Sequence, residues 1–212
     1  MEKEDYGPHE LRCLFLEKIS EFPISNAIHI YCDGSVIENQ AGCGIVIREF
    51  FERGISVENR ITRRISDNSS STITELYAIF EGLGHCLQKK KSVCCFVDSQ
   101  SALFALNSKS PVDEDIVYKC RQRISVIKAS GCQVIFMWIP SHCGIYLNDV
   151  ADDLAKKGCT KDTIDYECFM NIRRIKSNIV RTREGWDLLH ARMILDNGSE
   201  SLKHYDYVIN NF

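Results

Sequence analysis

The chain has 212 residues and a formal net charge of −3, and 44% of its residues are hydrophobic and 26% charged. This composition is typical of a globular protein and excludes a collagen, a coiled-coil rod and a wholly disordered chain. The nearly balanced charge also excludes a basic tail that binds nucleic acid by charge alone, although it leaves room for a locally basic groove.

The eleven cysteines form no C-x-x-C pair, and most of them stand in apolar runs. We therefore expect buried thiols that act as small hydrophobes, not a zinc knuckle or a disulfide framework. The N-terminal residues show no apolar signal segment, and no run approaches the roughly 20 apolar residues of a membrane span. These features predict an intracellular protein of the nucleus or cytoplasm, with no membrane partner.

The first elements predicted along the chain are a short helix over residues 9–21 and three strands, over residues 27–31, 42–48 and 55–65. The first strand is expected to end at Asp33-Gly34-Ser35, because this tripeptide is a turn signal. Short connections between the three strands favour an antiparallel meander.

Beyond residue 66 the hydrophobic period changes from that of strands to that of helices. Helical spacing predicts a long helix over 72–88, closed by Lys89–Lys91, and an almost wholly apolar strand follows at 92–97. The remaining elements are two helices, a fifth strand and a last helix, predicted at 99–106, 112–129, 132–139 and 148–157. The order β-β-β-α-β-α-α-β-α predicts an α/β protein with a mixed sheet and helices on its faces.

Three parts of the chain are predicted: an N-terminal extension over 1–26, a core domain over 27–158, and a C-terminal linker and amphipathic helix over 159–212. The C-terminal helix is expected over 171–194, with Asn171 as its N-cap. Its other face is basic. A solvated surface is the ordinary interpretation of such a face, and an RNA or a protein partner is the alternative.

Acidic residues stand at matching ends of several predicted elements. Asp33 ends the first strand, Asp98 ends the fourth, Glu75 lies in the first turn of the long helix, and Asp152 lies in the last helix. If strands one and four are neighbours, Asp33 and Asp98 meet at the carboxyl edge of the sheet. Each acid alone is an ordinary turn residue, helix acid or cap. Together they predict a site for Mg²⁺ or Mn²⁺, and two such ions about 4 Å apart can hydrolyse a phosphodiester.

Four segments carry a resemblance to a known family: YCDGS at 31–35, TELYAI at 74–79, VDSQSAL at 97–103, and WIPSHCGI-x-x-NDVAD-x-LAK at 138–156. With them the chain resembles type 1 ribonuclease H, most closely the ribonuclease H domains of non-LTR retrotransposon polyproteins. The match spans residues 27–158 and keeps the family's order. It implies a ribonuclease H-like fold, whose five-stranded mixed sheet has three antiparallel and then two parallel strands, with helices on both faces.

The resemblance implies an endonuclease that hydrolyses the RNA strand of RNA–DNA hybrids with two Mg²⁺ ions, Mn²⁺ being the alternative. It implies that Asp33 bridges the two ions, that Asp152 completes the site of the attacking water, and that Glu75 and Asp98 hold the other ion. His142 matches the family histidine that shuttles protons or aids product release.

The fourth acid has two neighbours on the last predicted helix, Asp149 and Asp153. The family pattern N-x-x-A-D selects Asp152. Asp149 shares a helix face with it at i, i+3 and is expected to support it, whereas Asp153 points elsewhere.

Substrate contacts are also implied, at Gly34, Ser35, Ser71, Thr72, Ser99, Gln100 and Asn148. Two departures bear on them. Ser71 and Thr72 stand where cellular members often carry amide side chains, and residues 107–115 are short and net acidic where many cellular members have a basic helix and loop. We therefore expect weak, salt-sensitive hybrid binding, as in a domain whose substrate is delivered by a reverse transcriptase domain of the same polyprotein.

Three functions compete on these residues. An active ribonuclease H is favoured, because all four acids and the histidine are present. A weak or inactive ribonuclease H-like nucleic-acid-binding module, dependent on a polymerase partner, is the second. Another nuclease or an integrase of the same superfold is the third, but the D-x-E pair expected on its first strand is missing, since Gly34 and Ser35 follow Asp33.

Overall fold

The computed structural model describes residues 7–20, 26–108 and 115–168. All of them belong to one compact unit of the chain, Met1–Cys168. The amphipathic helix predicted over 171–194 lies outside the described residues. None of the helices in the described ranges has the length and apolar character that crossing a membrane requires.

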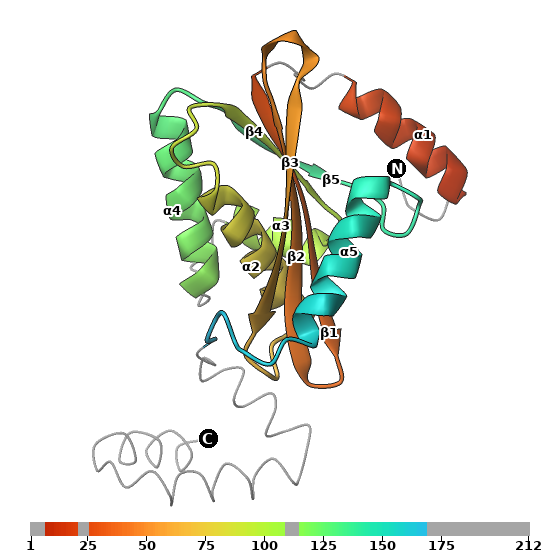
Figure 1. The fold of residues 1–212 in the computed structure, drawn as a ribbon, viewed down its shortest axis with the longest axis vertical. Helices are drawn as coiled ribbons and strands as arrows, with labels where there is room; N and C mark the ends of the chain where they lie inside the picture. The colour runs from red at the N-terminus through yellow and green to blue at the C-terminus, as the bar shows by residue number, and fades with distance from the viewer. Residues whose placement is uncertain (1–6, 21–25, 109–114, 169–212) are drawn as a thin grey trace, which may run out of the picture. The chain divides into compact units, whose positions relative to one another are not determined.

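The centre of the molecule is a five-stranded sheet with the order β3-β2-β1-β4-β5 (Figure 1). Its strands are β1 (Ala27–Ile37), β2 (Gln40–Phe50), β3 (Ser56–Ile65), β4 (Ser92–Val97) and β5 (Val134–Trp138). The first three pair antiparallel, and β4 and β5 extend the sheet in parallel with β1. The predicted mixed sheet is thereby confirmed.

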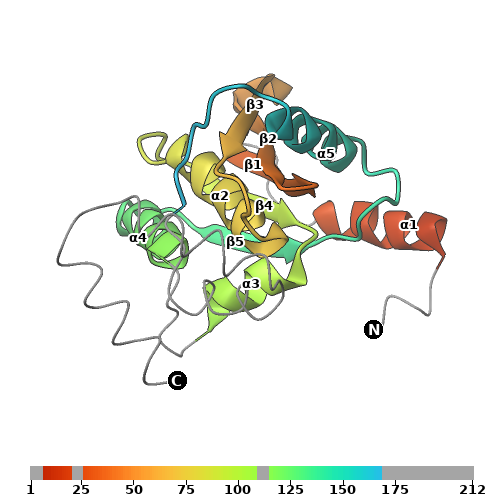
Figure 2. The same ribbon diagram turned by 90° about the horizontal axis from the view of Figure 1, so that it is seen from below.

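Helices cover both faces of this sheet (Figure 2). One face carries α2 (Ser71–Gly84), α3 (Gln100–Asn107) and α4 (Asp115–Ala129), and the other carries α1 (Pro8–Ile19) and α5 (Tyr146–Cys159). Alternate residues of β1 serve the two faces: Ile28, Ile30 and Cys32 belong to the core under α2, and Tyr31 belongs to the core under α5. This is the two-residue period of a strand that is covered on both sides.

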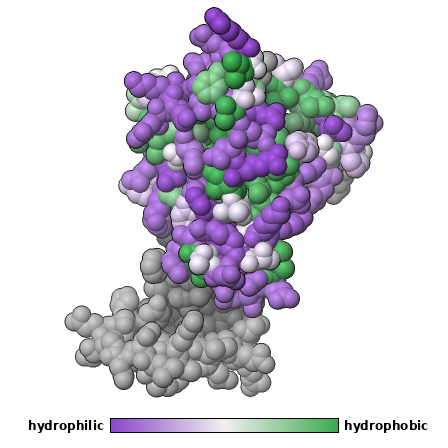
Figure 3. Space-filling view, in the orientation of Figure 1, coloured by the Kyte–Doolittle hydropathy of each residue, from purple (hydrophilic) through white to green (hydrophobic). Residues whose placement is uncertain are grey.

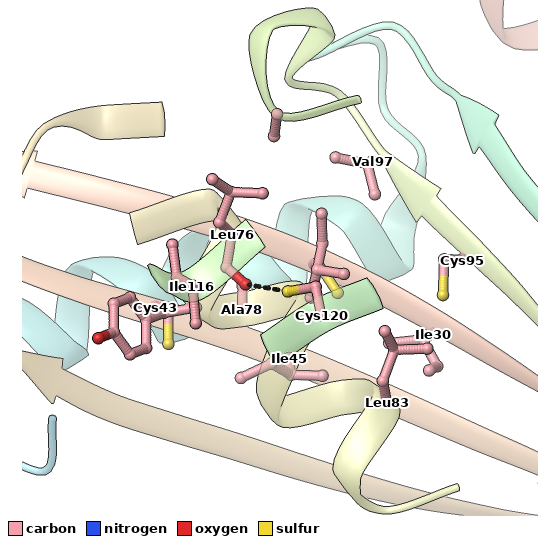
Figure 4. Close-up of a cluster of buried hydrophobic side chains, with 14 of the residues drawn as sticks. Ile30, Cys43, Ile45, Leu76, Ala78, Leu83, Cys95, Val97, Ile116 and Cys120 are labelled. Atoms are coloured by element: carbon pink, nitrogen blue, oxygen red, sulfur yellow. Dashed lines mark hydrogen bonds between the residues drawn. The ribbon is translucent and has the colours of Figure 1, made fainter. Parts of the chain in front are cut away.

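Cysteines contribute to the core as small hydrophobes. All eleven are free thiols, and eight of them are buried. Figure 4 shows Cys43, Cys95 and Cys120 among aliphatic side chains of the core under α2, where Cys120 Sγ donates a hydrogen bond to the Leu76 carbonyl at 3.4 Å. Burial raises the pKa of the Cys95 thiol, so it stays protonated.

Hydrophilic side chains, in contrast, dominate the face of the molecule shown in Figure 3.

The predicted end of the first strand is wrong. Gly34 and Ser35 remain paired with Cys43 and Gly42, and β1 continues to Ile37. The chain reverses instead after Ile37, where Glu38 takes a left-handed conformation with φ 56°. The ladder of hydrogen bonds to β2, the next strand along the chain, outweighs the local turn signal.

The helix predicted over 72–88 extends too far at its C-terminal end. It stops at Gly84, and Lys89–Lys91 lie outside it. Lys89 and Lys91 each place Nζ 3.0 Å from a Glu49 carboxylate oxygen, so these lysines bind the end of β2 and do not close the helix.

Residues 160–168, the described part of the predicted linker, lie along the edge strand β3. Tyr166 forms a parallel bridge with Ile65, and the Arg64 backbone N–H donates to the Asp165 carboxylate at 2.6 Å. The Tyr166 ring packs 5.1 Å from the Tyr77 ring. Its hydroxyl donates to the buried Glu81 carboxylate. This segment therefore covers part of an otherwise open sheet edge.

We expect Tyr166→Phe to lower the free energy of unfolding by about 1–2 kcal/mol, because it removes a hydrogen bond to a buried charged group. Burial alone would raise the pKa of Glu81, but hydrogen bonds from Tyr166 and Arg63 lower it below its usual value. Urea denaturation measures the effect. Tyr118→Phe, at an exposed tyrosine of α4, is the matched control and should leave the unfolding midpoint unchanged. Equal midpoints for the two variants would contradict this role.

Candidate active site

Three carboxylates meet at one edge of the sheet. One ligand oxygen from each of Asp33, Glu75 and Asp98 lies within 4.8 Å of the other two. The parallel pairing of β1 with β4 ends at Cys32 and Val97, so Asp33 and Asp98 come directly after the last residues that join these two strands. Glu75 comes from the second turn of α2, which begins at Ser71, and not from the first turn as predicted.

Gly34 allows Glu75 to reach this edge. A Cβ at Gly34 would lie 2.4 Å from the Glu75 backbone nitrogen and 2.6 Å from Thr74 Oγ1. Only a residue without a side chain therefore lets α2 approach β1 so closely. The Gly34 backbone N–H also hydrogen-bonds to the site's acids and lowers the pKa of both Asp33 and Glu75. The residue predicted to touch substrate thus also packs the site together.

The carboxylates raise one another's proton affinity. Burial, followed by the charges of Asp98 and Asp152, raises the pKa of Asp33 to about 7. Burial and the charge of Asp33 raise the pKa of Glu75 well above its usual value, and Glu75 Oε2 is buried without a hydrogen-bond partner. Burial raises the pKa of Asp98 as well. Such an all-oxygen, electrostatically frustrated cluster fits a hard divalent cation.

This frustration predicts a pH dependence of stability. The pKa of Asp33 is about 7 in the folded protein against an ordinary 3.8, so the folded protein keeps a proton that the unfolded chain loses. Deprotonation of Asp33 should therefore cost the metal-free protein stability as pH rises from about 4 to about 7. Mg²⁺ should raise Tm more at pH 8 than at pH 5, because it binds the deprotonated carboxylates. Thermal denaturation with KCl of matched ionic strength as the control measures both effects. An Mg²⁺ shift that is equal at the two pH values would contradict the site.

Asp152 lies near the three carboxylates without joining their cluster. Its charge raises the pKa of Asp33. Asp152 Oδ2 is bound by Lys156 Nζ at 2.5 Å. The sequence reasoning missed Lys156, although its i, i+4 spacing from Asp152 is the ordinary signal of a helical ion pair.

Two glycines of β2, which no sequence pattern singled out, hold α5 against the sheet. A Cβ at Gly42 would lie 2.4 Å from the Cys159 backbone nitrogen, and one at Gly44 would lie 2.0 Å from the Ala151 carbonyl oxygen. Thr62 Oγ1 adds a hydrogen bond to the Leu154 carbonyl at 2.7 Å. The close approach of α5 brings Asp152, next to Ala151, towards Asp33.

Asn148 lies behind Asp98. Its side chain is buried, and Nδ2 donates to Asp98 Oδ2 at 3.2 Å. Trp138 Nε1 donates to the Asp98 carbonyl at 3.0 Å, so the same aspartate is held at two points. Asn148 was predicted to contact substrate. With 3% of its surface exposed, it contacts an acid of the site instead.

The other predicted substrate residues gather at the starts of α2 and α3. Ser99 caps α3 by accepting from the Ala102 N–H at 3.3 Å, and Ser101 Oγ lies 3.0 Å from both Ser99 Oγ and Thr72 Oγ1. Sequence reasoning missed Ser101. Ser71 and Gln100 are exposed beside this hydroxyl cluster. Ser35 lies apart, in β1, where its carbonyl accepts from Cys159 Sγ.

His142 is exposed in the loop between β5 and α5, and takes a left-handed conformation with φ 56°. It is close enough for its charge to lower the pKa of Asp98, against the larger effect of burial. The structure therefore places the histidine on the same side of the sheet edge as the acids.

A sequence model of RNase H matches residues 25–160. The chain belongs to the RNase H family. The match includes all five strands and α2 to α5, and it confirms the resemblance at the level of the family; α1 lies outside it. As a ribonuclease H, the protein is a nuclease and a phosphodiester hydrolase.

Among curated proteins, ribonuclease HI of Haemophilus ducreyi (strain 35000HP / ATCC 700724) is 24% identical to this ribonuclease H over 159 residues, which cover 66% of this chain and 94% of the relative. Among solved structures, the N-terminal RNase H domain of rv2228c from Mycobacterium tuberculosis has a TM-score of 0.50 at 17% identity, with coverage of 63% of this chain and 98% of that one. A foamy viral protease-reverse transcriptase, solved in complex with an RNA/DNA hybrid, has a TM-score of 0.52 at 17% identity, with 66% and 21% coverage. These two structures show a shared fold.

Proposed function

We propose that this ribonuclease H is an endonuclease that hydrolyses the RNA strand of RNA–DNA hybrids by a two-metal-ion mechanism. The observation that carries the proposal is the cluster of Asp33, Glu75 and Asp98, whose oxygens lie within 4.8 Å of one another at the carboxyl edge of the sheet. Its supports are the family match and the hybrid in the foamy viral complex.

Asp33, Glu75 and Asp98 would hold the divalent cation. Their oxygen-only ligand set favours Mg²⁺ over Zn²⁺, with Mn²⁺ as the alternative. When bound, the metal would supply Lewis-acid activation of a water and stabilisation of the leaving oxygen. Asp33 would help to hold both ions, since the charges of both Asp98 and Asp152 act on its carboxylate. Asp152 would help to hold the ion that activates the water, which requires that its ion pair with Lys156 be broken.

The remaining side chains would orient groups and move protons. Asn148 and Trp138 fix the position of Asp98. His142 would transfer a proton or aid product release. We assign the hydroxyls at the starts of α2 and α3, together with Gln100, to sugar and phosphate oxygens, including the 2′-hydroxyl by which RNA differs from DNA.

We further propose that the protein derives from a non-LTR retrotransposon and acts inside the cell, in the nucleus or cytoplasm, with a reverse transcriptase domain of the same polyprotein delivering its substrate. Residues 27–158 would be the catalytic domain, between an N-terminal extension and a C-terminal linker and helix. The support is in the sequence: the four motif segments, and the short, net acidic stretch over 107–115. The low affinity expected of such a neutral chain suits a tethered enzyme.

A weak or inactive nucleic-acid-binding module is the second candidate function. The observation that favours it is the ion pair between Asp152 and Lys156, which occupies the carboxylate that the proposed mechanism needs.

The test is cleavage of a labelled RNA–DNA hybrid by the full chain in Mg²⁺ at low salt, beside single-stranded RNA, duplex RNA and duplex DNA. We expect cutting of the RNA strand of the hybrid alone, and its loss in Asp98→Asn. Asp153→Asn, at an exposed acid of α5, is the control for a lost charge. No cutting by the wild type in either Mg²⁺ or Mn²⁺, with hybrid binding retained, would replace the proposal by the binding module.

A further inference from the structure

Helix α1 lies outside the family match, yet it contacts the loop that carries His142. We propose that α1 is a positioning element for this loop, the His142 loop (residues 140–145), and that it acts through Arg12 and Phe15. The inference rests on the proposed function, because it concerns the step that His142 serves. In both Figure 1 and Figure 2, α1 lies beside the connection between β5 and α5.

Phe15 is the anchor of α1. It is 6% exposed, whereas its neighbours Leu14 and Leu16 are 38% and 51% exposed. Its ring stands edge-on to Phe96 of β4, with the centroids 5.8 Å apart. Phe15 belongs to the same hydrophobic cluster as three residues at the two ends of the His142 loop: Ile139, Ile145 and Leu147. One packed cluster therefore fixes α1 and both ends of the loop together.

Arg12 lies one turn before Phe15 and reaches the middle of the loop. A Cβ built at Gly144 would lie 3.7 Å from Arg12 Nη1, which is ordinary van der Waals contact. The loop needs such support, because His142 is left-handed, with a φ of 56°. A left-handed non-glycine residue persists only where its surroundings hold it.

The carboxylate site is built without α1. Asp33 and Asp98 are positioned by the pairing of β1 with β4, and Glu75 by the close approach of α2 to Gly34; no residue of α1 takes part in these two contacts. Releasing α1 should therefore move His142 and leave metal and hybrid binding intact. Since a displacement of about 1 Å can cost up to about 100-fold in rate, we expect a fall in kcat of about 10-fold, at unchanged KM and Mg²⁺ midpoint.

The experiment compares Phe15→Ala and Arg12→Ala with wild type in hybrid cleavage. Leu16→Ala is the matched control, because it shortens an exposed side chain of the same helix. Each variant is also combined with His142→Ala in a double-mutant cycle. The inference predicts that both α1 substitutions lower kcat in the wild-type background and have no further effect once His142 is absent. Full additivity with His142→Ala, or an equal loss in Leu16→Ala, would overturn it. Arg12→Ala guards against a failure of Phe15→Ala to fold, because Arg12 is exposed.

Hydrogen exchange tests the same contact without reference to activity. Amides of residues 141–145 should exchange at least about 10-fold faster in Phe15→Ala and Arg12→Ala than in Leu16→Ala, with those of β3, which has no residue in the Phe15 cluster, unchanged. Unchanged exchange in the loop would overturn the inference even if the enzyme is active. If the wild type cuts no hybrid but the loop loses protection, the proposed function fails and the structural coupling between α1 and the loop stands.

Discussion

Asp33→Asn is expected to lower kcat/KM for hybrid cleavage by at least about 10³-fold while making the metal-free protein more stable. Asp33 is the acid whose pKa is raised by burial and by the charges of both Asp98 and Asp152, so it lies where the charges of the site converge. An amide removes the negative charge that holds the metal, and the several kcal/mol of transition-state stabilisation that a metal supplies correspond to about this factor. The same change relieves repulsion among buried carboxylates.

The two halves of this expectation are measured separately, by hybrid cleavage in Mg²⁺ and by thermal denaturation at pH 8 in a chelator. A fall in activity together with a rise in stability supports the expectation, because a variant that merely unfolds loses both. Asp153→Asn removes an exposed charge from α5 and should change neither quantity. A variant of Asp33 that kept more than about a tenth of the activity would contradict the metal role. One that denatured at a lower temperature would contradict the electrostatic account.

Gly44→Ala is expected to destabilise the protein by about 3 kcal/mol or more and to reduce activity as well. The added Cβ would lie 2.0 Å from the Ala151 carbonyl oxygen and 2.4 Å from the Ala155 backbone nitrogen, so α5 must move away from β2. Overpacking a well-filled contact costs about 1–3 kcal/mol, and here the obstacle is backbone that cannot rotate aside. Asp152 follows Ala151 and would move with the helix.

Gly54→Ala is the control for this substitution. Its Cβ would meet nothing within 4 Å, but its φ of 74° is left-handed, so it should cost only about 1 kcal/mol of backbone strain. Urea denaturation of the two variants separates lost space from lost conformational freedom. If Gly44→Ala cost no more than Gly54→Ala, the close packing of α5 against β2 would be contradicted.

The chemistry of the site could be predicted from the sequence because it depends on residue type and order. Each acid alone is an ordinary turn, helix or cap residue, but their joint occurrence at matching ends of several elements predicts a site, and the family match over 25–160 agrees with the motifs that contain them. The hydrophobic period alone separated strands from helices. The structure contains all five predicted strands, and Asp33 and Asp98 follow the last residues that pair β1 with β4. The roles of the individual acids in catalysis stay predictions.

Contacts between distant segments could not be predicted in this way. A D-G-S tripeptide is a turn signal by itself, and only pairing with Cys43 and Gly42 keeps it in β1. Asn148 is predicted from the sequence as a substrate contact, and only the fold shows that its side chain lies against Asp98, 50 residues away. Tyr166 is predicted from the sequence as part of a linker, and only the fold shows that its hydroxyl binds Glu81.

Sequence patterns suffice to predict the class of fold, the ribonuclease H family and the acids that meet at the sheet edge, because periodicity and residue type are local properties. How tightly those acids are brought together, and what holds them, depends on three-dimensional packing. Gly34 and Gly44 matter only because the α2 and α5 backbones lie against them, and Phe15 matters only because it shares a cluster with the ends of the His142 loop. Close approach and shared burial join residues far apart in the chain, and no local pattern records them.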